Sequence, residues 1–391
     1  MIDFELSEDQ KVLQKMVRDF AQAEIAPHCR KWDNESHFPH ELIPKLGALG
    51  LLGMTTPEEY EGSGMSMLDV ALVIEELAAV DGSVAITVAS HNGLCSGHIN
   101  LFGSEEQKRR YLPELASGRK LGAWGLTEPG SGSDAAGART RAIRLDDGSW
   151  SLTGQKTFIT QGSVGGVAVI LAVTSPEKKQ RGITAFIVDY GTPGFSASRR
   201  IEKMGLHASD TAELTLDDVR VPDSQRLGEI DNGFIDTLRI LDQGRITIGA
   251  MALGLGAGAM QAAIRYSKDR RQFGKSLSEF QAIQNMIAQA VMELDASRLL
   301  LHRAAWMHDQ GMRFGLQASM GKLYAAQAAM RACSTAVQIH GGYGYTREFP
   351  VEKAMRDAKL CEIGEGTNEI QRLVIARELL SKGDLLVPGV L

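Results

Sequence analysis

Apolar residues recur at helical spacing through roughly the first third of the chain. Between Ser7 and Ala26 an apolar stripe repeats every three or four residues, beginning after Ser7 as a potential cap and ending before Pro27. The same spacing predicts four further helices, separated by Gly and Pro, over 41–49, 67–79, 84–101 and 105–116. We therefore expect residues 1–121 to form an N-terminal α-helical domain.

Short runs rich in β-branched residues replace this pattern near residue 121. Strands are predicted over 167–173, 183–188 and 212–219, and Asp146-Asp147-Gly148 is typical of a hairpin turn. No long helical pattern separates these runs, which favours a β-barrel or sandwich over a parallel βαβ sheet. We expect this middle β domain to span residues 122–230.

Helical spacing returns at residue 233 and persists to the end of the chain. Long helices are predicted over 233–270, 279–310 and 315–339, followed by shorter ones over 350–360 and 367–381. Their lengths suit a C-terminal four-helix-bundle domain over 231–391, and the whole chain is an α+β protein of three domains. Gly254 and Gly258 share one helical face with Ala250, and no strand precedes them. They predict close helix packing rather than a dinucleotide fingerprint.

Composition agrees with a multidomain globular protein. The chain has 391 residues, of which 43% are hydrophobic and 23% charged, and its formal net charge is -6. Basic residues are interspersed with acidic ones and no apolar run reaches the length of a membrane span, so we expect neither nucleic acid nor a membrane as a partner. The start of the chain, Met1 to Ser7, lacks the pattern of a targeting leader, which predicts a cytoplasmic, bacterial protein.

Cysteines and histidines give no metal or disulfide pattern. The four cysteines are far apart and read as reduced thiols, and the histidines never form H-E-x-x-H. No G-x-S-x-G elbow is present either. We therefore expect no bound metal and no serine-esterase chemistry.

One carboxylate is placed as a catalytic base would be. Glu365 lies between Gly364 and Gly366, where a helix capped by Thr367 or Asn368 is predicted to begin. The glycines let substrate or backbone approach closely. Taken alone, the pattern also fits an incidental acid at a helix start.

Two segments of the middle domain suit a flavin. Residues 124–134 combine Trp124 with a Gly/Ser-rich loop whose hydroxyls and free N–H groups could cradle a phosphate or the polar edge of a flavin. Phe158 and Thr160 are two apart in a predicted strand, hence on one face. An aromatic side chain beside a hydroxyl is what a flavin ring needs.

Two helix junctions offer groups for a nucleotide. Residues 269–275 contain guanidinium groups, and residues 338–344 contain glycines that permit close approach to a pyrophosphate or adenine. Each segment also fits a solvated loop. Thr87 and His91 are four apart on a predicted helix, where a packed polar pair is favoured over a pocket pair.

Five motifs in this order resemble the acyl-CoA dehydrogenase family, and its short-chain members most closely, over essentially the whole chain. They are T-E-P-G-S-G-S-D at 127–134, K-T-F-I-T at 156–160, R-x-Q-F-G at 270–274, Q-I-H-G-G-Y-G-Y at 338–345 and E-G-T-N-E-I-Q-R at 365–372. The resemblance implies a homotetramer, a dimer of dimers, with one FAD per subunit. It also implies oxidation of an acyl-CoA to the trans-2-enoyl-CoA, as in β-oxidation, with an electron-transferring flavoprotein as acceptor.

The resemblance also implies a role for individual residues. Glu365 matches the base that takes the α-proton while the β-hydride goes to flavin N5. Residues matching the flavin surroundings are Trp124, Leu126, Thr127, Ser133, Phe158, Thr160, Thr367 and Glu369. Residues matching contacts to the adenosine and pyrophosphate, partly from a neighbouring subunit, are Arg270, Gln272, Phe273, Phe280, Gln281, Gln338 and Gly342. Matching the substrate contacts are Ser133, Asp242, Arg245 and Gly366.

Departures from the family pattern narrow the expected substrate. Isovaleryl-type and long-chain relatives carry their base where this chain has Gly244, which favours Glu365 as the base. Glutaryl-type relatives place an arginine near Ala85, and this chain has none there, so a dicarboxylic acyl group is disfavoured. Gly364 replaces a tyrosine common in relatives, which predicts room for branched or cyclic acyl groups.

The sequence leaves the exact activity open. An enoyl-CoA reductase or an oxidase on the same scaffold stays possible, as does a non-catalytic protein that binds flavin or CoA. The acyl group, the pathway and the direction of electron flow are not fixed by these motifs.

Overall fold

Seven α-helices form the N-terminal part of the computed structural model, which describes residues 5–381. They are α1 (Glu8–Phe20), α2 (Cys29–Glu35), α3 (Ile43–Ala48), α4 (Met67–Val80), α5 (Gly82–Ser90), α6 (Gly97–Phe102) and α7 (Glu105–Ala116). The leader prediction rests largely on residues 1–4, and the predicted C-terminal domain includes residues 382–391; both segments lie outside the described residues.

The predicted cap of the first helix is confirmed. The Ser7 hydroxyl accepts a hydrogen bond from the Gln10 backbone N–H at 3.2 Å, and the Gln10 side chain accepts one from the Ser7 N–H at 3.1 Å. Such a reciprocal pair satisfies two N–H groups that a helix start leaves free. The single helix expected over 84–101 is helical throughout but contains a π-helical segment, His91–Ser96, between α5 and α6.

The middle of the chain forms one sheet of eight strands. They are β1 (Gly122–Gly125), β2 (Arg141–Arg144), β3 (Trp150–Thr160), β4 (Val167–Val173), β5 (Ile183–Asp189), β6 (Phe195–Ala197), β7 (Thr211–Val221) and β8 (Arg226–Leu227). The order is β6-β7-β3-β2-β4-β5-β8, with β1 on β4. Pairing is antiparallel except where β4 meets β1 and β2.

This sheet curls back on itself. The rings of Trp150 in β3 and Phe186 in β5 are 5.4 Å apart, although β2 and β4 lie between these strands in the sheet order. Three steps of about 4.8 Å would separate the same strands by roughly 14 Å in a flat sheet. The curled sheet encloses its own apolar core, as the predicted barrel or sandwich would.

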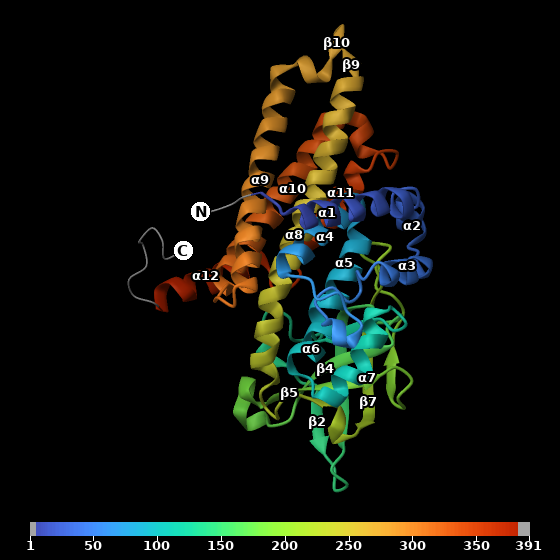
Figure 1. Cartoon of the computed structure of the whole chain (residues 1–391), viewed down its shortest axis with the longest axis vertical. Coiled ribbons are helices and arrows are strands. Elements are labelled where there is room, and N and C mark those ends of the chain that lie inside the picture. The colour runs from blue at the N-terminus through green and yellow to red at the C-terminus, as the bar shows by residue number, and fades with distance from the viewer. Residues whose placement is uncertain (1–4, 382–391) are drawn as a thin grey trace.

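Long helices dominate the C-terminal part. They are α8 (Gly233–Asp269), α9 (Gln281–Asp309) and α10 (Gly315–His340), followed by the shorter α11 (Val351–Ala358) and α12 (Asn368–Ser381). The hairpin of β9 (Arg271–Gln272) and β10 (Lys275–Ser276) joins α8 to α9 at one end of the molecule, opposite the β domain (Figure 1). By length and composition α8 could span a membrane, but 78% of its most apolar window is buried within the chain.

The glycines of α8 allow the close packing that was predicted. A Cβ on Gly254 would lie 2.2 Å from the Glu75 carbonyl oxygen, and one on Gly258 would lie 2.1 Å from that of Ala79. Both carbonyls belong to α4. Glycine therefore lets α8 contact the N-terminal domain at a distance that no other residue permits.

A buried polar junction ties the three parts together. Lys353 in α11 contacts Asp81 at 3.0 Å and Asp357 at 2.6 Å. Asp357 in turn accepts a hydrogen bond from the backbone N–H of Leu206, in the loop before β7, at 2.6 Å.

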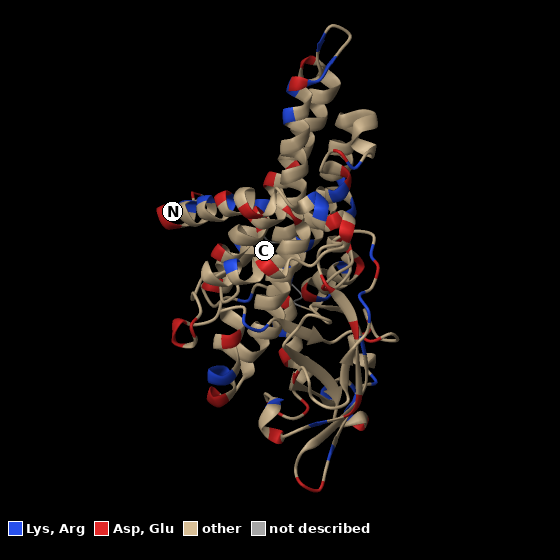
Figure 2. Cartoon of the chain, turned by 90° about the vertical axis from the view of Figure 1, so that its right-hand side faces the viewer, with Lys and Arg blue, Asp and Glu red and all other residues tan. Residues whose placement is uncertain are grey.

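Over the rest of the chain Lys and Arg are interspersed with Asp and Glu (Figure 2), as the sequence suggested.

Candidate active site

Glu365 stands in an unusual backbone turn just before α12. Its φ is +52° and that of Gly366 is +90°, both in the left-handed region. Residues other than glycine seldom adopt this conformation, and those that do often lie at functional sites. The residue is half-buried, whereas its Oε2 atom is buried and has no hydrogen-bond partner within residues 5–381.

Gly244 in α8 makes room for this carboxylate. A Cβ on Gly244 would lie 1.8 Å from Oε2 of Glu365, far inside van der Waals contact. Position 244, where some relatives carry the base, and position 365 therefore face the same point in this fold.

Burial sets the protonation of Glu365. Loss of solvent raises the pKa of Glu365 to about 7, against the opposing positive charges of Lys322 and Arg245. A carboxylate with this pKa can accept and return a proton near neutral pH. Arg245 was among the predicted substrate contacts, whereas Lys322 was not among the predicted site residues.

Two buried side chains hold the Glu365 turn by hydrogen bonds to its backbone. The Lys322 ammonium in α10 donates to the Gly366 carbonyl at 2.8 Å, and the Gln371 amide donates to the same oxygen at 2.9 Å. As predicted, Thr367 caps α12, because its hydroxyl accepts from the Ile370 N–H at 3.3 Å. Sequence reasoning missed Lys322, although a lysine among the alanines of an apolar helix was a usable signal.

The predicted substrate residues fall into two places. Arg245 is buried in α8 and pairs with Asp242 one turn earlier, and its Nε has no hydrogen-bond partner among residues 5–381. Gly366 follows the base directly. Ser133 lies exposed in the loop between β1 and β2. Asp242 and Arg245 of α8 thus lie on the same side of the molecule as Glu365, while Ser133 belongs to the β domain.

The predicted flavin face lies at the ends of β1 and β3. Trp124 is buried in β1, where its indole N–H donates to Nδ1 of His98 at 3.1 Å. Phe158 is 65% exposed and has a φ of +58°. Strand pairing is irregular between Lys156 and Ile159. This irregularity was not predicted, and the common face of Phe158 and Thr160 stays a prediction.

A buried ion pair anchors the loop that carries Leu126, Thr127 and Ser133. The Lys156 ammonium lies 2.7 Å from the Glu128 carboxylate and donates to the Leu126 carbonyl at 3.1 Å. Burial lowers the pKa of Lys156 to about 8, although the Glu128 charge opposes this shift. Neither residue was among the predicted site residues, because the sequence gives no sign that the charged Glu128 of a loop and Lys156 of β3 are buried.

The residues predicted to contact the adenosine and pyrophosphate gather at the far end of the long helices. Arg270, Gln272 and Phe273 belong to the β9–β10 hairpin segment, and Phe280 and Gln281 begin α9. The Arg270 guanidinium lies 5.5 Å from the centre of the Tyr343 ring, beside the segment that holds Gln338 and Gly342. Within one chain this group lies at the opposite end from the β domain (Figure 1).

These surroundings fit an FAD. Phe158 and Phe273 are large aromatic side chains at opposite ends of the molecule, exposed by 65% and 93%, and each offers a face to a planar ring of the cofactor. A Cβ at Gly130 or Gly132 would meet no described atom within 4 Å, so the backbone of this loop is open to a ligand. Thr367 and Glu369 stand beside the base turn, where the resemblance implies a flavin contact.

Thr87 and His91 are packing residues, the interpretation that the sequence favoured. The Thr87 hydroxyl donates to the Ser83 carbonyl at 2.8 Å. The His91 ring accepts from the Gly122 N–H at 3.0 Å and contacts the Leu115 carbonyl at 3.1 Å. Burial lowers the pKa of His91 to about 4, so the ring is neutral at physiological pH.

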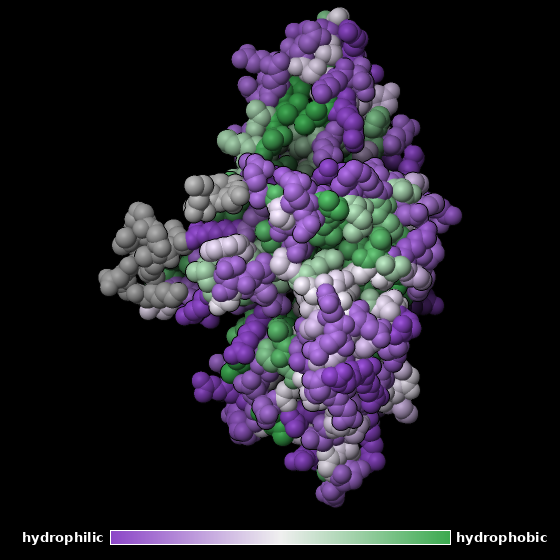
Figure 3. All heavy atoms as spheres, in the orientation of Figure 1, coloured by the Kyte–Doolittle hydropathy of each residue, from purple (hydrophilic) through white to green (hydrophobic). Residues whose placement is uncertain are grey.

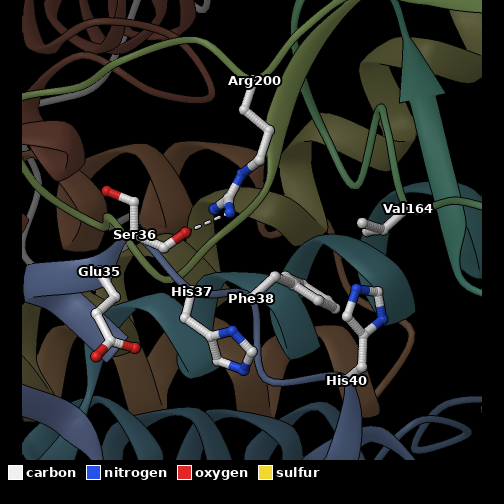
Figure 4. Close-up of a pocket in the computed structure, with 7 residues that line it drawn as sticks. All are labelled: Glu35, Ser36, His37, Phe38, His40, Val164 and Arg200. Atoms are coloured by element: carbon white, nitrogen blue, oxygen red, sulfur yellow. Dashed lines mark hydrogen bonds between the residues drawn. The ribbon is translucent and has the colours of Figure 1, made fainter. Parts of the chain in front are cut away.

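Two cavities lie outside the candidate site. One of about 360 Å³ is lined in part by Arg200, whose guanidinium donates to the Ser36 carbonyl (Figure 4). Its lining residues are Glu35, Ser36, His37, Phe38, His40, Val164 and Arg200. A second, of about 340 Å³, lies among α2, α4, α8 and α11. Neither is lined by Glu365 or by the residues predicted to contact FAD.

Comparison with known proteins agrees with this arrangement. Three family models match in order: the acyl-CoA dehydrogenase N-terminal domain over residues 7–119, the middle domain over 123–219 and the C-terminal domain over 231–380. The probable acyl-CoA dehydrogenase YngJ of Bacillus subtilis is 46% identical over 380 residues, which cover 97% of this chain and 100% of that protein.

Two further relatives extend the comparison. The structure of butyryl-CoA dehydrogenase from Megasphaera elsdenii is similar at a TM-score of 0.95 and 43% identity, covering 97% of this chain and 100% of that one. The caffeyl-CoA reductase-Etf complex subunit CarC of Acetobacterium woodii is 41% identical over 377 residues, covering 96% and 99% of the two chains. Proteins of this family use FAD. The chain belongs to the acyl-CoA dehydrogenase family of flavin-dependent oxidoreductases.

Proposed function

We propose that the protein oxidises a short-chain acyl-CoA to its trans-2-enoyl-CoA, with Glu365 as the base that removes the α-proton. The observation that carries this proposal is the buried Oε2 of Glu365, which has no hydrogen-bond partner in the described part of the chain. The residue lies in a left-handed turn, and burial raises its pKa to about 7. The similarity to a butyryl-CoA dehydrogenase supports a short acyl chain.

The α-proton of a thioester is weakly acidic, so the base must be matched to it. Entry of substrate removes the water that remains near Glu365, which raises its pKa further and strengthens it as a base. Lys322 and Arg245 favour the ionised carboxylate before that step and oppose the effect of burial. The backbone N–H of Glu365 is our candidate donor to the thioester oxygen, where negative charge develops. Bound FAD supplies the hydride acceptor.

Gly364 supports a pocket that tolerates branched or cyclic acyl groups. A Cβ at this position would lie 3.4 Å from the Leu360 carbonyl oxygen and 3.6 Å from the Leu360 side chain. These are ordinary contacts, so the backbone does not demand glycine here. We infer that the missing side chain leaves space for the substrate instead.

We infer a homotetramer that passes electrons to an electron-transferring flavoprotein. The two groups of predicted FAD residues lie at opposite ends of one chain, so a second subunit is needed to complete the site. Apolar surface between the long helices (Figure 3) and five exposed side chains of α9 support such an assembly. Those side chains are Met286, Val291, Met292, Leu299 and Trp306. The relative from the caffeyl-CoA reductase-Etf complex supports the choice of acceptor.

Enoyl-CoA reduction is the second candidate, because that same relative is named a reductase. The chemistry at Glu365 is then reversed, and the residue returns a proton to the α-carbon. Steady-state rates would decide the physiological direction, measured with acyl-CoA and oxidised electron-transferring flavoprotein and with enoyl-CoA and the reduced flavoprotein.

Anaerobic titration with a panel of acyl-CoAs tests the proposed function directly. We expect the yellow holoenzyme to bleach with short acyl-CoAs, and the Glu365→Gln variant to stay yellow and folded without bleaching. Bleaching of that variant near the wild-type rate would overturn the base assignment. A colourless protein that ignores acyl-CoA would favour a non-catalytic role, and rapid turnover in air would favour an oxidase.

A further inference from the structure

Lys322 is a lysine without exposed surface in the middle of α10. Its ammonium donates to the Gly366 carbonyl at 2.8 Å and to the Asn368 side chain at 3.4 Å. Burial of a cation destabilises the fold unless charge and hydrogen bonds compensate it. A methionine or leucine would fill the same space without that cost, so the charge itself calls for an explanation.

The Lys322 ammonium contacts the segment that follows the base and forms no ion pair among the described residues. The other nearby cation, Arg245, is paired with Asp242, whereas both hydrogen bonds of Lys322 go to neutral groups of the segment that follows Glu365. Charged and titratable groups reach this region from α8 with Asp242 and Arg245, from the turn before the base with Cys361 and Glu362, and from α12 with Glu378.

The balance of these groups leaves Lys322 positively charged near neutral pH. Burial lowers the pKa of Lys322 to about 8, while Cys361 and Glu365 favour the charged form and Arg245 disfavours it. Lys322 also opposes the effect of burial on Glu365 more strongly than Arg245 does. The two residues therefore stabilise each other's ionised state.

We propose that Lys322 is a positioning residue for the base: its hydrogen bond to Gly366 holds the left-handed turn, and its positive charge favours the ionised form of Glu365. This inference rests on the proposed role of Glu365. It adds a second cation to the site, contributed from α10, beside the arginine of α8.

The chain offers a matched control for this proposal. Gln371 is also fully buried and donates to the same Gly366 carbonyl, at 2.9 Å, but carries no charge. Gln371→Met removes this bond and the second hydrogen bond of the amide, to the Glu365 carbonyl at 3.3 Å, and leaves the charge. Lys322→Gln can keep a donor near Gly366 and removes the charge, and Lys322→Met removes both.

The test is the pH profile of anaerobic flavin reduction by butyryl-CoA, together with a titration of the Glu365 carboxyl by infrared difference spectroscopy in the substrate-free holoenzyme. We expect both Lys322 variants to move the acid limb and the carboxyl titration upward by about one pH unit or more, since loss of a neighbouring opposite charge has this effect. Gln371→Met should lower the rate and the melting temperature without moving either midpoint.

Three outcomes separate the possible failures. If Lys322→Gln leaves both midpoints at their wild-type values, the proposal is overturned and Lys322 is only a structural donor. If Gln371→Met moves the midpoints as far as Lys322→Gln, the effect comes from the turn and the proposed charge effect is overturned. If Lys322→Met does not fold, the two midpoints measured for Lys322→Gln decide the test. The base assignment on which this proposal rests is tested separately, and it fails if Glu365→Gln still reduces the flavin.

Discussion

Gly244 and Glu365 occupy complementary space: a Cβ on the glycine would lie 1.8 Å from Oε2 of the carboxylate. The glycine belongs to α8 and the carboxylate to the turn before α12, so the contact joins two elements that are 121 residues apart in sequence (365 minus 244). The carboxylate position depends on the absence of a single methyl group in a neighbouring helix.

We therefore expect Gly244→Ala to displace the Glu365 carboxylate. A misplacement of about 1 Å can cost on the order of a hundredfold in rate, and we expect flavin reduction by acyl-CoA to slow by about that factor. Gly93→Ala is the control, because a Cβ at Gly93 meets no described atom within 4 Å. Equal rates for both variants would contradict the placement of the carboxylate against α8.

The protonation of Glu365 predicts a pH-dependent stability. The fold raises its pKa from 4.5 to about 7, so the folded protein holds the proton more tightly than the unfolded chain does. Ionisation therefore destabilises the fold by a term that is absent below about pH 4.5 and complete above about pH 7. That term is about 3 kcal/mol by linkage.

Glu365→Gln removes this term because glutamine stays neutral. The melting temperature of the variant should exceed that of the wild type above about pH 7 and approach it as the pH falls toward 4.5. Calorimetry across this range measures the difference. A difference that stays constant with pH would show that Glu365 is not the titrating group.

The buried Glu128–Lys156 pair predicts a cost when one partner is neutralised. Glu128→Gln leaves the Lys156 ammonium buried without a carboxylate, and breaking such a pair costs about 3 to 5 kcal/mol. Denaturant unfolding should show this loss, and FAD should dissociate at a lower temperature because the loop with Thr127 loses its anchor. The double variant Glu128→Gln, Lys156→Met should recover part of the stability.

A solvent-exposed lysine serves as the control for that experiment. The exposed Lys178 side chain contacts Asp231 at 2.6 Å, and Asp231 also accepts hydrogen bonds from the Thr174 and Ser175 hydroxyls. Lys178→Met should therefore leave both unfolding and FAD release near wild type. If the two single variants, Glu128→Gln and Lys178→Met, behaved alike, the Glu128–Lys156 pair would not be the anchor of the loop.

Gly364 predicts the range of substrates. Gly364→Tyr should abolish flavin reduction by branched and cyclic acyl-CoAs and leave butyryl-CoA within a few-fold of wild type, because the ring would fill the space beside the acyl chain. Gly364→Ala adds only a Cβ with ordinary contacts and should change little. A uniform loss over the whole acyl-CoA panel in Gly364→Tyr would instead indicate damage to the turn.

Local sequence signals were sufficient for most helices and one turn. The Ser7 cap, the glycine face of α8 and the Thr367 cap each follow from a few neighbouring residues. The predicted hairpin is present, since the Leu145 N–H donates to the Ser149 carbonyl at 2.8 Å and Gly148 has a φ of +82°. The pairing of β1 with β4, by contrast, joins strands 45 residues apart (122 to 167) and leaves no local pattern.

Site residues that belong to a local sequence motif were predictable, whereas residues whose role depends on burial were not. Glu365 is marked by its flanking glycines. Lys322, Gln371 and Lys156 are polar residues whose roles appear only when packing removes them from water and aims them at one turn or one loop. The bulge at Phe158 was missed for a similar reason, because strand irregularity is set by the partner strand.

The polar junction at Asp357 limits how the domains of this chain can be recombined. Its groups come from all three domains: Asp81 from the first, the Leu206 N–H from the second, and Lys353 and Asp357 from the third. A chimaera that imports the middle domain of a relative must also present a backbone donor at the position of Leu206. Without it, Asp357 loses that bond inside the hybrid, so compatible parents must be chosen by this loop rather than by overall identity.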